Sequence, residues 1–173
     1  MSATESTLLR KEMSLRVILQ ELRGAQTWKR FHQLTGFSCA QLWKMEHLGH
    51  SCPPKKVKVL SDIAQKCGRP LSQKEIMTLL LGEHLAGRLA DLDLLMKGRN
   101  PLDIWLRSTS SQRDQAKILG LHYSTIFRRR TGKFKRFWPK RAVEIARRSN
   151  YEIDLFDLLG CLTSDNQAPK IIV

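Results

Sequence analysis

Apolar side chains recur every three to four residues along most of the chain, which is the spacing of amphipathic α-helices. The first such run predicts a helix that starts at Leu8 or Ser14 and ends at Arg23. Capping residues and terminating glycines predict four more helices within 27–36, 38–49, 56–67 and 72–82. Glycine, proline and aromatic residues are all scarce, so the pattern favours an all-α fold.

A leucine-rich segment follows these helices and precedes a second set. Its apolar positions predict either a connecting helix over 83–98 or an extension that packs the two halves of the chain together. Gly98 and Pro101 mark its end, and Pro101 suits the first turn of the next helix because that position needs no amide hydrogen.

The second half of the chain repeats the pattern of the first half. Residues 34–49 align with 118–132, and residues 62–68 align with 144–150, at an offset that drifts only from 84 to 82. Similarity at a nearly fixed offset predicts a duplicated domain. Shared helical periodicity without duplication is the alternative. The alignment rests on these pairs: Gly36 with Gly120, Phe37 with Leu121, Leu42 with Ile126, and Trp43 with Phe127.

These patterns predict a division of the chain into four parts. The first is a degenerate helix-turn-helix-like domain over 8–82, and the second is the connecting helix over 83–98. A second helix-turn-helix domain over 99–160 and a tail over 161–173 complete the chain. The predicted fold is therefore all-α, with two tandem helix-turn-helix domains.

The segment 111–132, SQRDQAKILGLHYSTIFRRRTG, predicts two short helices joined by a tight turn at Gly120. It resembles the Cro-like, XRE-type repressors of phages and bacteria. A glutamate is frequent in that family near the end of the second helix, where this chain has Arg130. The alternative is a helical hairpin with a solvated charged face. The resemblance rests on Ser111-Gln112, Ala116, Gly120-Leu121, Ser124-Thr125-Ile126 and Gly132.

The charge of the chain agrees with a polyanionic partner. The formal net charge is +14 and the isoelectric point is about 10.1. Residues 99–148 hold 14 Lys and Arg but only 3 Asp and Glu, a net +11 that leaves +3 for the rest of the chain. The positive charge therefore lies mainly on and after the segment 111–132, although charge alone does not distinguish DNA, RNA and anionic lipid.

The resemblance implies that the helix Tyr123–Arg130 reads the major groove of double-stranded DNA. Phe127 either contacts a thymine methyl group or belongs to the core. The predicted base contacts are Tyr123, Ser124, Phe127 and Arg128. The predicted phosphate contacts are Gln112, Arg113, Arg129, Arg130, Lys133, Lys135, Arg136 and Arg141.

The first repeat is the weaker candidate for DNA binding. Its matching helix carries Glu46, which would be repelled by phosphates if it faced them. The repeat therefore either binds DNA weakly or serves dimerisation or partner binding. If both repeats bind, one chain acts as a covalent pseudo-dimer. Its candidate DNA contacts are Gln41, Lys44, Lys55 and Lys56.

Together these observations predict a transcription regulator of bacterial, phage or mobile-element origin. We expect it in the cytoplasm and on the nucleoid when DNA-bound, without a membrane span, a cofactor, a metal or enzymatic activity. A homodimer and contacts with RNA polymerase or a regulatory protein stay open. The alternatives are an RNA or single-strand binder, an antitoxin or anti-activator that keeps the fold, and a zinc site near Cys39, His47, His50 and Cys52.

Overall fold

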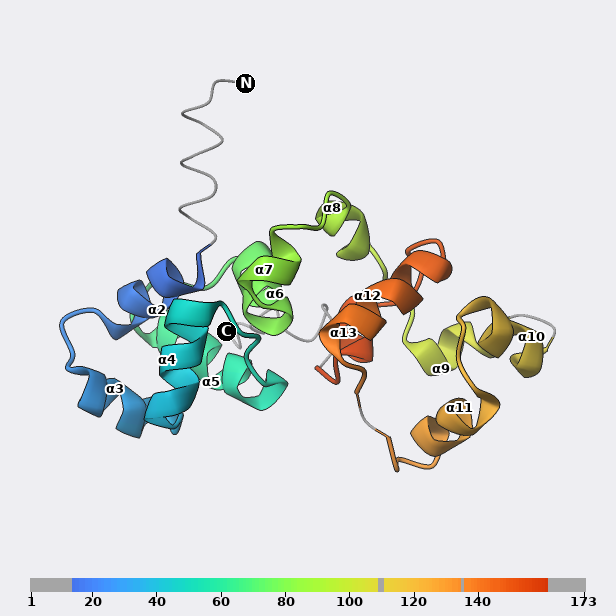
Figure 1. The fold of residues 1–173 in the computed structure, drawn as a ribbon, viewed down its shortest axis with the longest axis horizontal. Coiled ribbons are helices and arrows are strands. Elements are labelled where there is room, and N and C mark those ends of the chain that lie inside the picture. The colour runs from blue at the N-terminus through green and yellow to red at the C-terminus, as the bar shows by residue number, and fades with distance from the viewer. Residues whose placement is uncertain (1–13, 109–110, 135, 162–173) are drawn as a thin grey trace, which may run out of the picture. The chain divides into compact units, whose positions relative to one another are not determined.

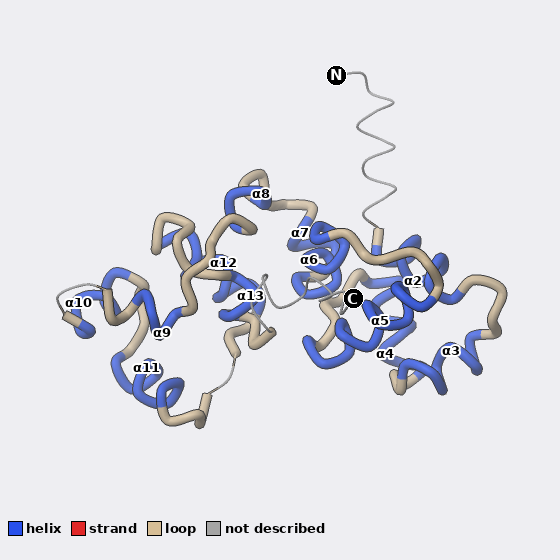
Figure 2. The backbone as a smooth tube through the Cα atoms, turned by 180° about the vertical axis from the view of Figure 1, so that it is seen from behind, coloured by secondary structure: helices blue, strands red, loops and turns tan. Residues whose placement is uncertain are grey.

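The computed structural model describes residues 14–108, 111–134 and 136–161. Within these residues the backbone forms helices and loops with no strand, which confirms the all-α prediction at that level (Figure 2). The chain divides into two compact units, residues 1–90 and 91–173.

The first unit contains six helices in its described part (Figure 1). Helix α2 packs against α4, α5 and α6, and α3 packs against α5. Leu15 and Ile18 of α2, Phe31 of α3 and Leu60 of α5 are fully buried and form the centre of this core. The helices are α2 (Leu15–Arg23), α3 (Trp28–Thr35), α4 (Cys39–Leu48), α5 (Pro54–Lys66), α6 (Gln73–Leu81) and α7 (Glu83–Ala86).

Side-chain caps fix where the helices of the first unit begin. Thr27 caps α3, and Ser38 forms a capping box with Gln41 at the start of α4. Ser72 and Glu75 form a second capping box at the start of α6. These caps satisfy amide groups that have no partner within the helix. The helix starts predicted after Thr27, Ser38 and Ser72 are confirmed.

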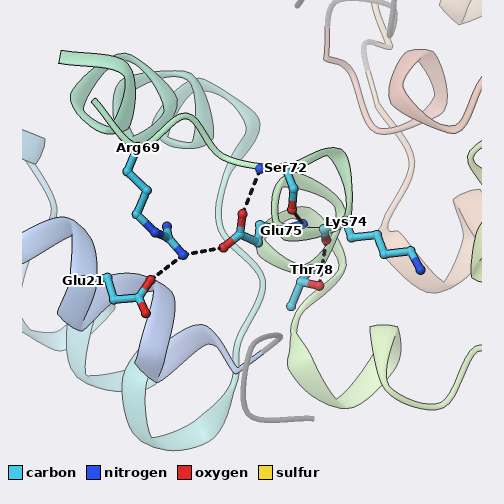
Figure 3. A network of polar contacts seen from close by, with 6 residues as sticks. All are labelled: Glu21, Arg69, Ser72, Lys74, Glu75 and Thr78. Atoms are coloured by element: carbon cyan, nitrogen blue, oxygen red, sulfur yellow. Dashed lines mark hydrogen bonds and ion pairs between the residues drawn. The ribbon is translucent and has the colours of Figure 1, made fainter. Parts of the chain in front are cut away.

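An ion-pair network ties the start of α6 to α2 (Figure 3). The Arg69 guanidinium contacts the carboxylate of Glu21 and lies 2.8 Å from that of Glu75. Burial raises the pKa of Glu75, but the hydrogen bonds from Ser72 and Arg69 outweigh it and hold the pKa below its usual value. The network therefore stabilises the ionised form of Glu75, which the capping box requires.

Four helices of the second unit, α10 to α13, follow one another in the order of α3 to α6, and each is shorter than its counterpart. Helix α12 packs against α8 and α13, and α10 packs against α11. Leu102, Ile145, Ile153 and Leu158 are fully buried. The helices are α8 (Leu92–Leu95), α9 (Leu102–Trp105), α10 (Gln112–Ile118), α11 (Tyr123–Arg130), α12 (Pro139–Arg148) and α13 (Leu155–Leu158).

Asp91 fastens the start of α8 to the end of α12. Its carboxylate accepts hydrogen bonds from Arg147 at 2.6 and 2.7 Å and from the Tyr151 hydroxyl at 2.9 Å. The hydrogen bond from Arg147, opposed by desolvation and assisted by that from Tyr151, holds the pKa of Asp91 at about 2. The hydrogen bond between the Tyr151 hydroxyl and the Asp91 carboxylate in turn raises the pKa of Tyr151.

The predicted continuous connecting helix over 83–98 is wrong. The segment forms two helices of four residues, α7 and α8, separated at Gly87, which is a weak helix former. Helix α7 packs against α6, whereas α8 packs against α12. The leucines of this segment are thus divided between the cores of the two units, with Leu92 and Leu95 buried in the second.

Two smaller expectations also change. The helix predicted over 56–67 begins earlier, at Pro54, because proline is well suited to the first helical position. Leu34 is spaced for a helical apolar stripe with Trp28 and Phe31, yet it is 45% exposed. The buried positions of that short helix are Phe31 and Thr35, one turn apart, and Leu34 lies about 100° away from Thr35 around the axis.

Three structural features recur at matching places in the two units. Gly36 ends α3 and Gly120 follows α10, with φ angles of +62° and +67° that favour glycine. The third residue of the helix after each pair, Lys56 in α5 and Arg141 in α12, donates a hydrogen bond to the carbonyl oxygen of that glycine. A common helical frame therefore holds α3–α4 and α10–α11.

The third shared feature lies at the start of α5 and α12. Each helix begins with proline. The residue before its N-cap donates its backbone amide to a carbonyl oxygen of α6 in the first unit and of α13 in the second. Cys52 donates to the Leu79 carbonyl at 2.6 Å, and Phe137 donates to the Leu158 carbonyl at 2.8 Å. Both donor residues are buried. The loop after α4 and the loop after α11 are therefore anchored in the same way.

Candidate nucleic-acid interface

Helices α10 and α11 are joined by a short turn that hydrogen bonds fix. The backbone amide of Leu121 donates to the Ala116 carbonyl at 2.7 Å, and Gly120 adopts its left-handed φ between them. His122 caps α11, where its Nδ1 accepts a hydrogen bond from the Ser124 amide. Ile126 is 2% exposed and holds α11 to the core. The sequence prediction of a helix over Tyr123–Arg130 is confirmed.

The side of α11 opposite Ile126 is exposed. Tyr123 is 45% and Phe127 56% exposed, and Ser124 and Arg128 are exposed beside them. These four residues follow the spacing i, i+1, i+4, i+5, so they share one side of the helix and are called the α11 face below. The exposure of Phe127 decides against its placement in the core.

Two residue pairs link α10 with α11 at the edge of this face. The Arg113 guanidinium lies 6.0 Å from the centre of the Tyr123 ring, within the range of a cation–π interaction. Arg130 donates a hydrogen bond to the Gln112 side-chain oxygen at 2.9 Å. Because Arg113 and Arg130 are exposed, their guanidinium groups add positive charge beside the α11 face.

Arg129 points away from this surface, which removes it from the predicted phosphate contacts. Its guanidinium lies 2.7 Å from an Asp157 carboxylate oxygen and donates to the Asp157 carbonyl at 3.0 Å. The side chain is only 10% exposed. Arg129 is two positions after Phe127, which turns it by about 200° around the helix and directs it away from the α11 face. Arg129 therefore joins α11 to α13.

Arg141 is also held within the unit rather than left for phosphate. Its guanidinium contacts the Glu144 carboxylate and donates to the Gly120 carbonyl. Arg148 lies 2.9 Å from the same carboxylate. The hydrogen bond from Arg141 is the largest influence and lowers the pKa of Glu144. Arg141 supports the turn between α10 and α11, and we remove it from the predicted phosphate contacts.

The loop between α11 and α12 presents further charge. Lys133 and Arg136 are exposed, and Lys135 lies outside the described residues. Trp138, the N-cap of α12, is 81% exposed, and Lys140 beside it is exposed as well. Trp138 and Lys140 are not among the contacts predicted from the sequence. A tryptophan within a run of basic residues is the sequence signal that could have identified Trp138.

The first unit brings only part of its predicted contacts to the surface. Lys44, Lys55 and Gln41 are exposed, but the Gln41 side-chain oxygen already accepts a hydrogen bond from the Ser38 amide in the capping box. The Lys56 ammonium donates to the carbonyl oxygens of Thr35 and Gly36 at 3.0 and 2.6 Å. Lys56 is therefore a support of the turn, like Arg141, and is removed from the candidate DNA contacts.

A metal site and a membrane-spanning helix are both absent from the described residues. No group of three or more His, Cys, Asp and Glu side chains there lies close enough to hold a metal ion. In the same ranges no helix has the length and apolar content needed to cross a bilayer. His47, one of the candidate zinc ligands, stacks on Trp43 with 4.9 Å between the ring centres.

Comparison with known proteins gives no relative for this chain: no family model, curated protein or solved structure matches it.

Proposed function

We propose that the protein is a sequence-specific, double-stranded DNA-binding transcription regulator in which α10 and α11 form a helix-turn-helix. In this proposal α11 enters the major groove, and the surrounding cations contact the phosphate backbone. The observation that carries the proposal is the α11 face. On one side of a surface helix it places two exposed aromatic rings beside a hydroxyl and an arginine, and exposed apolar surface rimmed by polar groups marks interaction sites.

The chemistry of the α11 face suits base edges. The Arg128 guanidinium can donate two parallel hydrogen bonds to guanine, a contact worth about 1–3 kcal/mol of discrimination. Phe127 supplies apolar area for the methyl group of thymine. Ser124 hydrogen bonds to His122 at 2.7 Å, which orients its hydroxyl at the start of α11.

The phosphate contacts in this proposal come from exposed cations that are not paired with a buried carboxylate within the described part of the chain. Four such contacts would give a slope of about −4 for the logarithm of affinity against the logarithm of salt concentration. The four residues are Arg113, Arg130, Lys133 and Arg136.

The test measures binding of the full-length protein to duplex fragments from around its own gene at two salt concentrations. One fragment should bind far more tightly than bulk DNA. Arg128→Ala should remove about 5- to 150-fold of that preference while weak, salt-sensitive binding remains. The matched control Lys97→Ala removes a charge after α8, which packs against α12, and should leave the preference unchanged.

Three results would count against this proposal. Equal binding of all fragments, with a uniform loss in Arg128→Ala, would contradict sequence-specific regulation. Preference for single-stranded over duplex competitors would favour RNA or single-strand binding instead. Absence of DNA binding together with co-purification of one defined protein would favour the antitoxin or anti-activator alternative.

A further inference from the structure

The first unit presents a second exposed helix face at the place that α11 occupies in the second unit. Both helices follow a glycine turn, and both are buttressed by a cation at the third position of the following helix. At the same offset of 84, α4 carries Cys39, Ala40, Trp43 and Lys44 where α11 carries its four face residues. These four residues, called the α4 face, are all exposed, and Trp43 is 52% exposed.

Exposed cations also match between the units. The two cations of each pair occupy the same position counted from the first residue of their helices. Those first residues are 84 positions apart for α3 and α10 and for α4 and α11, and 85 positions apart for α5 and α12. All six side chains are exposed. The pairs are Lys29 with Arg113 in α3 and α10, Lys44 with Arg128 in α4 and α11, and Lys55 with Lys140 in α5 and α12.

Glu46, the acidic residue of α4, lies at the edge of the α4 face, at the position that Arg130 takes beside the α11 face. The Glu46 side chain is only 12% exposed and lies 3.8 Å from the Arg16 guanidinium of α2. Its charge is therefore directed toward α2 and partly neutralised there. The repulsion between Glu46 and phosphate that the sequence suggested is correspondingly reduced.

Charge divides equally between the units once their boundary is known. Residues 1–90 contain 14 Lys and Arg and 7 Asp and Glu, while residues 91–173 contain 16 and 9. Each unit thus carries a formal charge of +7. The first unit has as much net attraction for a polyanion as the second, which favours DNA over a second copy of the same cationic unit.

We propose that the first unit is a second site for double-stranded DNA, with α4 in the major groove and Lys29 and Lys55 on the phosphate backbone. The inference rests on the function proposed for the second unit. Ala40 and Trp43 offer apolar surface where α11 offers Ser124 and Phe127, so the site of the first unit contains thymine methyl groups and differs in sequence from that of the second.

A selection experiment tests this second site. Full-length protein selects duplexes from a pool with about 40 randomised base pairs, roughly four turns of B-DNA. The wild type should enrich two motifs. The Trp43→Ala/Lys44→Ala double variant should lose one motif, and Arg128→Ala should lose the other. The control Lys66→Ala removes an equal charge about 15 Å further along α5 from Lys56 and should keep both.

The outcomes separate this inference from the function proposed for the second unit. If only one motif is enriched and the α4 variant leaves it unchanged, the second site is refuted while the proposed function of α11 stands. If only the motif that depends on α4 is enriched, the second site stands and the role of α11 fails. If the wild type enriches no motif, both proposals fail.

A salt titration gives a readout that does not depend on base recognition. On a duplex carrying both motifs, Lys29→Ala/Lys55→Ala should make the slope of log affinity against log salt less negative by about 2. Both side chains are exposed, so the variant should keep the circular dichroism spectrum of the wild type. An unchanged slope in a folded variant would overturn the second site.

Discussion

Helices α4 and α11 occupy the same place in their units but present different chemistry. The α11 face combines Tyr123 and Phe127 with Arg128, whereas the α4 face combines Ala40 and Trp43 with Lys44. The frame beneath them is shared, down to the cation that donates to the glycine carbonyl of the turn. The difference teaches that the buried frame can stay constant while four exposed positions determine what the surface binds.

The loops after these two helices differ more than the helices do. Between α11 and α12 the chain places three basic residues, Lys133, Lys135 and Arg136, while the loop 49–53 after α4 has no Lys or Arg. Near its end each loop has a buried residue, Cys52 or Phe137, whose amide donates to a carbonyl of α6 or α13 respectively. Phosphate contacts from this loop are therefore proposed for the second unit only, and Lys29 and Lys55 take that role in the site proposed for the first unit.

The largest expected effect comes from the core of one unit. Phe31→Ala removes a fully buried ring and should lower the free energy of unfolding by about 3–5 kcal/mol. Denaturant titration measures this loss, with Leu34→Ala on the exposed side of α3 as the matched control. Hydrogen exchange should lose protection in residues 14–90 only. An equal loss in the second unit would contradict the division into two separate cores.

The next effect separates two neighbouring arginines of α11. Arg129→Ala should destabilise the second unit by about 2–4 kcal/mol, because it removes the cation from the largely buried carboxylate of Asp157 and leaves it, among the described residues, only the Leu102 amide as a donor. Arg128→Ala should change stability by less than about 0.5 kcal/mol, since Arg128 is exposed. Thermal denaturation of both variants measures the contrast. Equal stability losses would contradict the separate roles assigned to the two arginines.

The smallest expected effect concerns acid stability and the contact between α8 and α12. Because the folded pKa of Asp91 is about 2, the stability that its ionised form contributes is present above the unfolded pKa near 4 and is lost as the pH falls from about 4 toward 2. With Arg147 nearly half exposed, solvent screening limits this contribution to about 1 kcal/mol.

Asp91→Asn tests that contribution directly. The variant should be less stable than the wild type at neutral pH, and the difference should shrink as the pH falls toward 2. Urea denaturation at a series of pH values measures it. The network of Arg69 in the first unit should keep its own acid dependence in this variant. A stability difference that stays constant from pH 6 to about 2 would refute the depressed pKa of Asp91.

Local sequence signals were sufficient for the helices that carry the candidate site. Ser38 and Gly36 bracket the turn before α4, and the sequence places α11 at its observed bounds, Tyr123–Arg130. Caps and glycine turns act within a few residues, so their effect can be predicted without knowledge of the tertiary fold. The exposed positions of the α11 face follow from the burial of Ile126 and helical geometry.

The sequence predictions are wrong where a contact with a residue far along the chain determines the position of a side chain. Arg129 is bound by Asp157, which lies 28 positions away, and Lys56 is bound by carbonyls 20 and 21 positions away. Nothing within one helix shows that these cations are already engaged. The prediction of a connecting helix over 83–98 is wrong for a related reason. The segment is divided between two units, and periodicity alone does not show which unit each of its apolar residues joins.

An NMR titration of the full-length protein tests the central claim most directly. Isotope-labelled protein is titrated with a short duplex selected from the randomised pool, and amide shifts are followed by residue. The account predicts the largest shifts in Tyr123–Arg130 and in the loop containing Lys133 and Arg136, with small shifts in α8 and α13. Large shifts confined to other helices, or equal shifts with a scrambled duplex, would contradict recognition of DNA by α11.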